Sequence, residues 1–200
     1  MAVDPLSIVP QRILVAAQEV LDILCSHGHP ACAIGGLAVL RWGQPRATQD
    51  ADISVLAPFG EEADVIDLLV ERFTARRHDA REFAKARRVV IITASNGAPV
   101  DVGLAALPFE REALERSEVW HWSTDIAFPV CSADDLIIYK LAAARPHDLV
   151  DMEGVVRLQW RQLDVERIRH RAGQLSEMLE GPNLLELIER ALAAARRTVT

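Results

Sequence analysis

Two aspartates separated by one residue, Asp50 and Asp52, are the side chains of this sequence best suited to chemistry. They lie in residues 46–56, where an alternating pattern predicts a strand, so both carboxylates point from the same face. Two carboxylates a few Å apart repel each other and raise each other's pKa unless a cation lies between them. A hard divalent ion such as Mg²⁺ prefers oxygen ligands and usually takes one or two carboxylates together with substrate phosphates. The pair therefore indicates a metal site, or else two solvated acids on an edge strand.

A glycine pair, Gly35-Gly36, precedes this strand, and a further acid, Asp101, lies in a later one. Glycine lets the backbone turn tightly and approach a ligand closely. Asp101 is flanked by valines after a hairpin signal at 95–98, and burying an unpaired carboxylate is costly, so Asp101 either faces solvent or shares a cation. If its strand lies beside the acid pair, three carboxylates gather. That suits two divalent ions, one activating an attacking hydroxyl and the other holding a triphosphate.

The elements that must position these residues follow from apolar periodicity and from glycine and proline breaks. The expected helices are 10–26, 37–42, 61–73, 108–116, 133–144, 147–159, 164–179 and 184–196. The expected strands are 32–34, 46–56, 87–94, 99–104, 119–122 and 126–130. The change from mixed α and β to all-α predicts a sheet domain at 1–130 and a helical domain at 131–200. Ser132 followed by an acid three residues later predicts the start of the first helix of that second domain.

Composition limits the classes of protein that this chain can belong to. Half of its 200 residues are hydrophobic, which supports a sizeable core, and no apolar run is long enough to span a bilayer. Residues 1–5 lack the basic and apolar regions of a signal peptide, and three cysteines are too few and odd for a disulfide framework. These features predict a cytoplasmic protein with no membrane partner.

The net charge of −7 disfavours polyanions, so any contact with nucleic acid needs a local basic patch. The dense basic run at 76–88 is either a solvated face or a surface for an RNA backbone. Two cysteines and two histidines at 25–32 are residue types that bind zinc, but they are spread over a helix end and a buried strand, which disfavours a metal site. They are Cys25, His27, His29 and Cys32.

The glycine turn, the acid pair and the later strand acid together resemble the nucleotidyltransferase fold shared with DNA polymerase β. The residues that carry this resemblance are Gly35, Gly36, Arg46, Thr48, Asp50, Asp52 and Asp101. The resemblance implies an α+β fold with a mixed sheet, flanking helices and a C-terminal helical bundle. It also implies that the glycines hold a nucleoside triphosphate and that the three acids bind Mg²⁺, with two ions expected. Thr48 could contact phosphate or brace the strand, and Arg46 could pair with the triphosphate or with Asp101.

The segment 134–151 is similar to the AbiEii-type and mycobacterial MenT-type toxins, in which a lysine and an Arg-Asp-Leu-x-Asp segment line the active site. This resemblance assigns Lys140 to the triphosphate as a point charge and makes Asp148 a functional acid that orients Lys140 or the acceptor. Asp151 matches a structural partner, for instance of Arg145. His147 departs from the family pattern, where arginine or lysine is expected, and this leaves the contacts of that turn open.

The resemblance implies an enzyme that moves a nucleoside monophosphate from a nucleoside triphosphate to a hydroxyl. The implied acceptor is the 3′ end of tRNA, and the implied role is the toxin of a toxin–antitoxin pair with a cognate antitoxin protein as partner. One alternative is an antibiotic-type transferase that modifies a small molecule. Another is a non-catalytic nucleotide-binding module or antitoxin partner, against which the intact acid pair argues.

Overall fold

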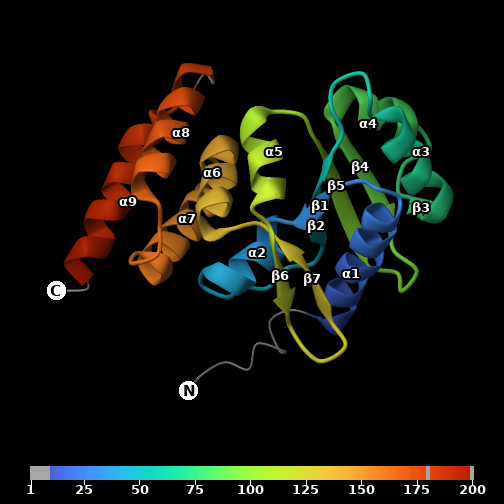
Figure 1. Cartoon of the computed structure of the whole chain (residues 1–200), viewed down its shortest axis with the longest axis horizontal. Helices are drawn as coiled ribbons and strands as arrows, with labels where there is room; N and C mark the ends of the chain where they lie inside the picture. Colours follow the sequence, from blue (N-terminus) through green and yellow to red (C-terminus); the bar gives the residue numbers. More distant parts are fainter. Residues whose placement is uncertain (1–9, 179–180, 199–200) are drawn as a thin grey trace. The chain divides into compact units, whose positions relative to one another are not determined.

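The computed structural model describes residues 10–178 and 181–198, which form a seven-stranded mixed sheet and nine helices (Figure 1). Residues 1–5, on which the expectation about a signal peptide rests, lie outside the described residues. The mixed sheet with flanking helices and a C-terminal group of helices confirms the predicted fold class. None of the helices in the described part of the chain is both long and apolar enough to cross a membrane.

Two compact units divide the chain, one formed by residues 1–37 and 46–131 and the other by residues 38–45 and 132–200. The strands, all in the first unit, are β1 Ala31–Ala33, β2 Ala51–Leu56, β3 Thr74–Ala75, β4 Val89–Thr93, β5 Pro99–Ala105, β6 Glu118–His121 and β7 Ala127–Val130. The helices that begin in the first unit are α1 Gln11–Ser26, α2 Gly35–Trp42, α3 Ala63–Arg72, α4 Ala80–Arg87 and α5 Pro108–Glu115. The remaining helices are α6 Ala133–Ala143, α7 Pro146–Gln159, α8 Val165–Met178 and α9 Leu184–Thr198.

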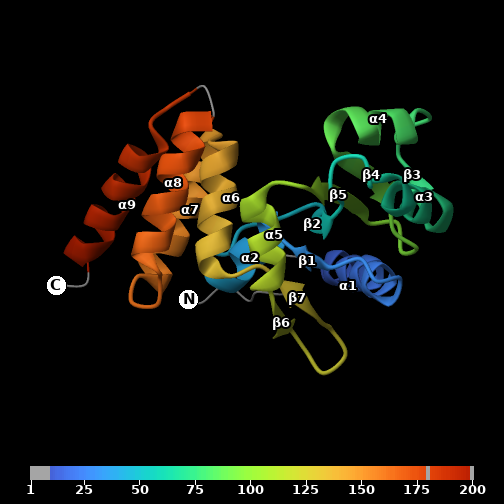
Figure 2. The same ribbon diagram turned by 45° about the horizontal axis from the view of Figure 1, so that its top comes forward.

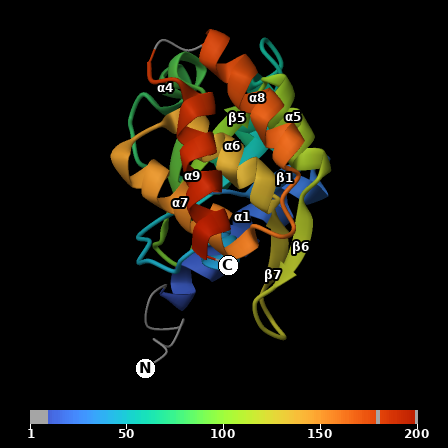
Figure 3. The same cartoon turned by 90° about the vertical axis from the view of Figure 1, so that its left-hand side faces the viewer.

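The sheet runs in the order β3-β4-β5-β2-β1-β7-β6. Strand β2 pairs in parallel with β5, and β1 pairs in parallel with β7, whereas the other pairs are antiparallel. The hairpins β4–β5 and β6–β7 join neighbours directly, and the second of them is plain in Figure 3. The central position of β2 therefore puts the strand that follows Asp50 next to the strand that carries Asp101.

Alternation along β2 places Asp52 on the face of the sheet opposite to its apolar side chains. Ala51, Ile53 and Val55 are fully buried, as predicted, and helix α1 packs against this part of the sheet. Asp52, on the opposite face, is only half-buried. Burial of the apolar face holds the register of β2, because a slip by one residue would exchange its apolar and acidic side chains.

Helices α6 to α9 form the second unit together with residues 38–45. Helix α6 packs on α7 and α8, and α9 packs on the same two helices (Figure 2). The Ser132 hydroxyl accepts a hydrogen bond from the backbone N–H of Asp135, which confirms the predicted cap of α6.

Several boundaries differ from the sequence predictions. Helix α2 begins at Gly35 rather than at residue 37, so the glycine pair forms its first turn. Strand β2 begins at Ala51, which leaves Asp50 immediately before the strand. The sequence did not predict strand β3, just before the basic run, or helix α4, within it.

Candidate active site

The carboxylates of Asp52 and Asp101 belong to residues that are paired in register across β2 and β5. Paired residues of adjacent strands point to the same face and lie on strands about 4.8 Å apart. Asp50 lies near enough to Asp101 for its charge to raise the pKa of that carboxyl. The fold thus brings the three predicted acids to one edge of β2 and β5.

Thr48 braces Asp50 in this arrangement. The Thr48 side chain is buried, and its hydroxyl donates to the backbone carbonyl of Asp50 at 3.1 Å. The same hydroxyl lies 3.4 Å from the Asp50 carboxylate. Of the two roles open for Thr48, the structure therefore supplies the bracing contact. Arg46 is exposed, and its guanidinium donates to the Ala47 carbonyl at 3.3 Å.

Gly35 and Gly36 lie directly against the acidic face. Gly35 has a left-handed backbone with φ +54°, and a Cβ there would overlap the carboxylate of Asp52. A Cβ on Gly36 would lie 2.5 Å from the Thr48 hydroxyl oxygen. The Gly36 N–H, in the first turn of α2, is 3.4 Å from Asp52 Oδ2, where the positive end of the helix dipole favours a negative charge. Both positions require glycine because of this close approach.

Replacing Gly35 with alanine is expected to destabilise the fold by about 1–2 kcal/mol through backbone strain and, in addition, to displace Asp52. Gly97→Ala is the matched control, because Gly97 also has a positive φ, +79°, but its Cβ would meet nothing within 4 Å. Denaturant unfolding should show a similar strain cost in both variants, whereas binding of a Mg²⁺-nucleotide should weaken only in Gly35→Ala. Equal nucleotide binding by the two variants would contradict the steric argument.

Arg76 forms an ion pair with Asp101, the third of the predicted acids. Its Nη1 lies 2.9 Å from Asp101 Oδ1, in a half-exposed ion pair that the sequence had not indicated. Burial raises the pKa of the Asp101 carboxyl above 3.8, Arg76 opposes this rise, and the charge of Asp50 adds to it. Because the folded state binds this proton more tightly than the unfolded chain, the stabilising contribution is complete below pH 3.8 and is lost as the pH rises through the raised pKa.

Removing the guanidinium in Arg76→Gln is expected to raise the pKa of Asp101 further, since burial and Asp50 would then act without opposition. NMR titration of the Asp101 carboxyl carbon in metal-free protein measures this directly. Arg72→Gln, which changes another exposed arginine of the first unit, should leave the titration unchanged. A pKa that falls in Arg76→Gln would show that the ion pair is not formed in solution.

The donor set fits a magnesium ion better than a transition metal. Carboxylate oxygens from Asp50, Asp52 and Asp101 are hard ligands of the kind that Mg²⁺ prefers, and Gly35 packs closely against Asp52. Within residues 10–178 and 181–198, no three His, Cys, Asp or Glu side chains are already gathered closely enough to hold an ion. One of the three acids, Asp101, contacts Arg76 at 2.9 Å.

The basic run at 76–88 is largely neutralised by its own neighbours. Ion pairs join Arg77 to Asp79 at 2.7 Å and Arg81 to Asp67 at 2.6 Å. Arg88 pairs with the Glu62 carboxylate at 3.1 Å. The sequence suggested a possible RNA surface here, but these carboxylates cancel much of the positive charge that such a surface would need.

Lys140 lies in the second unit, in a buried cluster with two aspartates. Its Nζ is 2.8 Å from both Asp148 Oδ1 and Asp151 Oδ2, and only 6% of the residue is exposed. Arg145 Nε lies 3.6 Å from Asp148 Oδ2, a buried oxygen that has no hydrogen-bond partner among the described residues. Lys140 and Asp148 thus pair with each other, as one reading of the sequence suggested, and Asp151 joins them.

No protein-family model and no curated protein matches this sequence. The solved structures that are similar to the chain in fold include a nucleotidyltransferase-like protein and an antibiotic-resistance factor. An antigenic nucleotidyltransferase-like protein from Paracoccidioides brasiliensis is 10% identical to this chain, with a TM-score of 0.52. The matched region covers 92% of this chain and 94% of the Paracoccidioides protein. The antibiotic-resistance factor ANT(2'')-Ia is 16% identical to this chain, with a TM-score of 0.53. The matched region covers 94% of this chain and 97% of the resistance factor. The chain therefore has the nucleotidyltransferase fold.

Proposed function

We propose that this protein is a Mg²⁺-dependent nucleotidyltransferase that moves a nucleoside monophosphate from a nucleoside triphosphate to a hydroxyl and releases pyrophosphate. The observation that carries the proposal is the register pairing of Asp52 with Asp101, with Asp50 beside them and Gly35 packed against Asp52. In a protein without such chemistry, three acids on one sheet edge would only repel each other.

Each residue of this site has a distinct part in the proposed reaction. Gly35 and Gly36 lie at the start of α2, where backbone N–H groups favour phosphate oxygens, and a bound triphosphate would compete with Asp52 for the Gly36 N–H. Asp50 and Asp52 hold metal, and Thr48 keeps Asp50 in place. Asp101 would help one metal ion to activate the attacking hydroxyl. Bound Mg²⁺ would supply charge neutralisation at the triphosphate and would lower the pKa of a coordinated hydroxyl.

The proposed acceptor is the 3′ hydroxyl of tRNA, and the proposed role is the toxin of a toxin–antitoxin pair. Both come from the resemblance of the glycine turn, the acids and the segment 134–151 to AbiEii-type and MenT-type toxins. Expression of the wild type should arrest growth, and expression of Asp52→Ala should not. Arrest by both proteins would separate toxicity from the proposed chemistry.

A small-molecule acceptor is the second candidate, and the ion pairs of the basic run favour it. With Arg77, Arg81 and Arg88 held by carboxylates, the first unit offers less free positive charge for an RNA backbone than its sequence suggested. An antibiotic-type substrate needs no such surface.

The test is incubation with each of the four α-labelled nucleoside triphosphates, Mg²⁺, and either total tRNA or a panel of aminoglycosides. Label in tRNA supports the first acceptor, and label in an aminoglycoside supports the second. A γ-labelled triphosphate distinguishes nucleotidyl transfer from phosphoryl transfer, because its label should leave as pyrophosphate. Absence of α-label from every acceptor would contradict the proposed reaction.

A further inference from the structure

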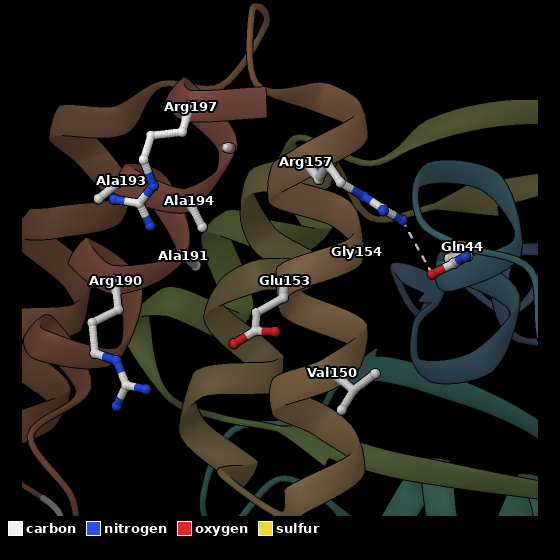
Figure 4. A pocket seen from close by; sticks show the side chains of 11 residues that line it. Gln44, Val150, Glu153, Gly154, Arg157, Arg190, Ala191, Ala193, Ala194 and Arg197 are labelled. Atoms are coloured by element: carbon white, nitrogen blue, oxygen red, sulfur yellow. Dashed lines mark hydrogen bonds between the residues drawn. The ribbon is translucent and has the colours of Figure 1, made fainter. Parts of the chain in front are cut away.

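The second unit contains a basic pocket of about 520 Å³ that the proposed reaction does not use. Helices α7 and α9 and residue Gln44 line it (Figure 4). Arg157, Arg190 and Arg197 are among the lining residues, with Arg157 directed at Gln44 and the two others on α9, and Glu153 on α7 lines the pocket as well (Figure 4). Three positive charges against one negative charge make this a cationic site on a chain whose net charge is −7.

The three arginines are not held by carboxylates. In the part of the chain that the structure describes, Arg157 donates to the Gln44 side-chain oxygen at 3.2 Å, and no ion pair joins Arg157, Arg190 or Arg197 to an acid. Elsewhere in the same unit Arg167 and Arg169 each contact a carboxylate, at 2.8 and 2.5 Å. The donors of the pocket arginines therefore remain available to an anion from outside.

Small residues create the space between these charges. Arg190 and Arg197 are seven residues apart on α9, which places them on one face about 10.5 Å apart along the axis. Ala193 and Ala194 lie between them on that face, and both line the pocket (Figure 4). Larger side chains at these two positions would fill it.

We infer that this pocket binds phosphate groups of the RNA acceptor, and this inference rests on the proposed function. Guanidinium groups match phosphate oxygens in a bidentate geometry, and the volume suits a sugar-phosphate segment better than a single small ion. Among the described lining residues, Val150 is the only apolar side chain larger than alanine. A protein partner would need apolar or aromatic anchor pockets, whereas nucleic-acid interfaces are polar and rich in arginine.

Replacing Glu153 is expected to change the affinity for RNA in the opposite direction from replacing the arginines. Glu153 lines the same pocket and its carboxylate repels phosphate, so Glu153→Gln should bind RNA more tightly than the wild type. Ala194→Trp should weaken binding with no change in charge, because it fills the pocket. Misfolding cannot produce the gain expected for Glu153→Gln.

The test is fluorescence anisotropy of labelled deacylated tRNA at several KCl concentrations, without nucleotide. Replacing Arg157, Arg190 and Arg197 with glutamine should weaken binding by at least about tenfold at 100 mM KCl. The slope of log affinity against log salt should become less negative by about 2, at about 0.7 per lost phosphate contact. The matched control has the same charge change on the exposed surface of the first unit, outside the basic run, and should leave the slope unchanged: Arg12→Gln, Arg72→Gln and Arg111→Gln.

Three outcomes would overturn the inference. The first is that the wild type does not bind tRNA. The second is that the pocket variant and the matched control lose equal amounts of tRNA affinity. The third is that polyglutamate displaces tRNA when both are present at equal charge concentration. The last would assign the pocket to an acidic protein segment instead. Binding of tRNA is measured without nucleotide and the chemistry by transfer of α-label, so failure of the chemistry and failure of this pocket give different results.

Discussion

Replacing Asp52 with asparagine is expected to lower the rate of nucleotidyl transfer by about 10³-fold or more while the protein stays folded. Asp52 combines register pairing with Asp101, contact with Gly35 and a position at the N-terminus of α2. Asparagine keeps the size of the side chain but removes the negative charge that would hold the cation. A loss of this size is what removal of one preorganised electrostatic group at a transition state produces.

The measurement is single-turnover transfer of α-labelled nucleotide under saturating Mg²⁺, with thermal unfolding as a check of the fold. Asp125→Asn is the matched control, because Asp125 is an exposed acid of the first unit. It should transfer label at the wild-type rate. If the transfer rate of Asp52→Asn is within about tenfold of the wild-type rate, the loss is too small for removal of a metal ligand, and Asp52 does not have the proposed role.

The second large effect is expected on stability. Replacing Lys140 with methionine should destabilise the protein by about 3–5 kcal/mol, because two buried carboxylates then lose their cation. Asp148 and Asp151 each lie 2.8 Å from Lys140 Nζ, and both are nearly inaccessible to solvent. Lys85→Met is the control, since Lys85 is exposed on α4 and its replacement should change stability by less than about 0.5 kcal/mol.

Adding Asp148→Asn and Asp151→Asn to Lys140→Met should recover part of the lost stability, since no buried charge then remains unpaired. This balanced variant also tests the catalytic role that the family resemblance assigns to Lys140. If it folds but does not transfer label, the cluster of Lys140, Asp148 and Asp151 acts in the reaction. If it transfers label at the wild-type rate, the cluster is structural. Urea unfolding that shows no loss in Lys140→Met would contradict the buried ion pairs themselves.

The sheet was largely predictable because its strands have strong local signals. The β-branched run before the hairpin at 95–98 became β4, and the valines around Asp101 became β5. Asp52 and Asp101 are 49 residues apart, and only the order of strands in the sheet shows that they are neighbours. A fold resemblance could indicate this pairing, whereas periodicity could not.

The basic run shows where local reasoning was insufficient. Helix α4 buries only Ala80 and Ala84, small residues that give a weak apolar pattern among many charges. Strand β3 is two residues long and exists because it pairs with β4. The pairing of Arg81 with Asp67 depends on how α3 and α4 meet, which no local pattern records.

The candidate site was only partly predictable for a similar reason. The glycines and acids could be named from residue type and spacing, but Arg76, which holds Asp101, is 25 residues away in sequence. Likewise, the joint pairing of Lys140 with Asp148 and Asp151 depends on the corner between α6 and α7. The ion pairs of Arg77, Arg81 and Arg88 make the basic run a weaker candidate for binding RNA than its sequence suggested. The pocket lined by α7 and α9 could not be found from the sequence, because it depends on how these helices pack.

The most direct test of the central claim is NMR of ¹⁵N-labelled protein during titration with Mn²⁺ and a non-hydrolysable nucleoside triphosphate. Manganese takes the same oxygen ligands as magnesium and broadens nearby amide signals. The signals of Gly35, Gly36, Asp52 and Asp101 should broaden first, and this effect should be absent from Asp52→Asn. Broadening centred on other residues, or unchanged in Asp52→Asn, would show that these carboxylates are not where the metal and nucleotide bind.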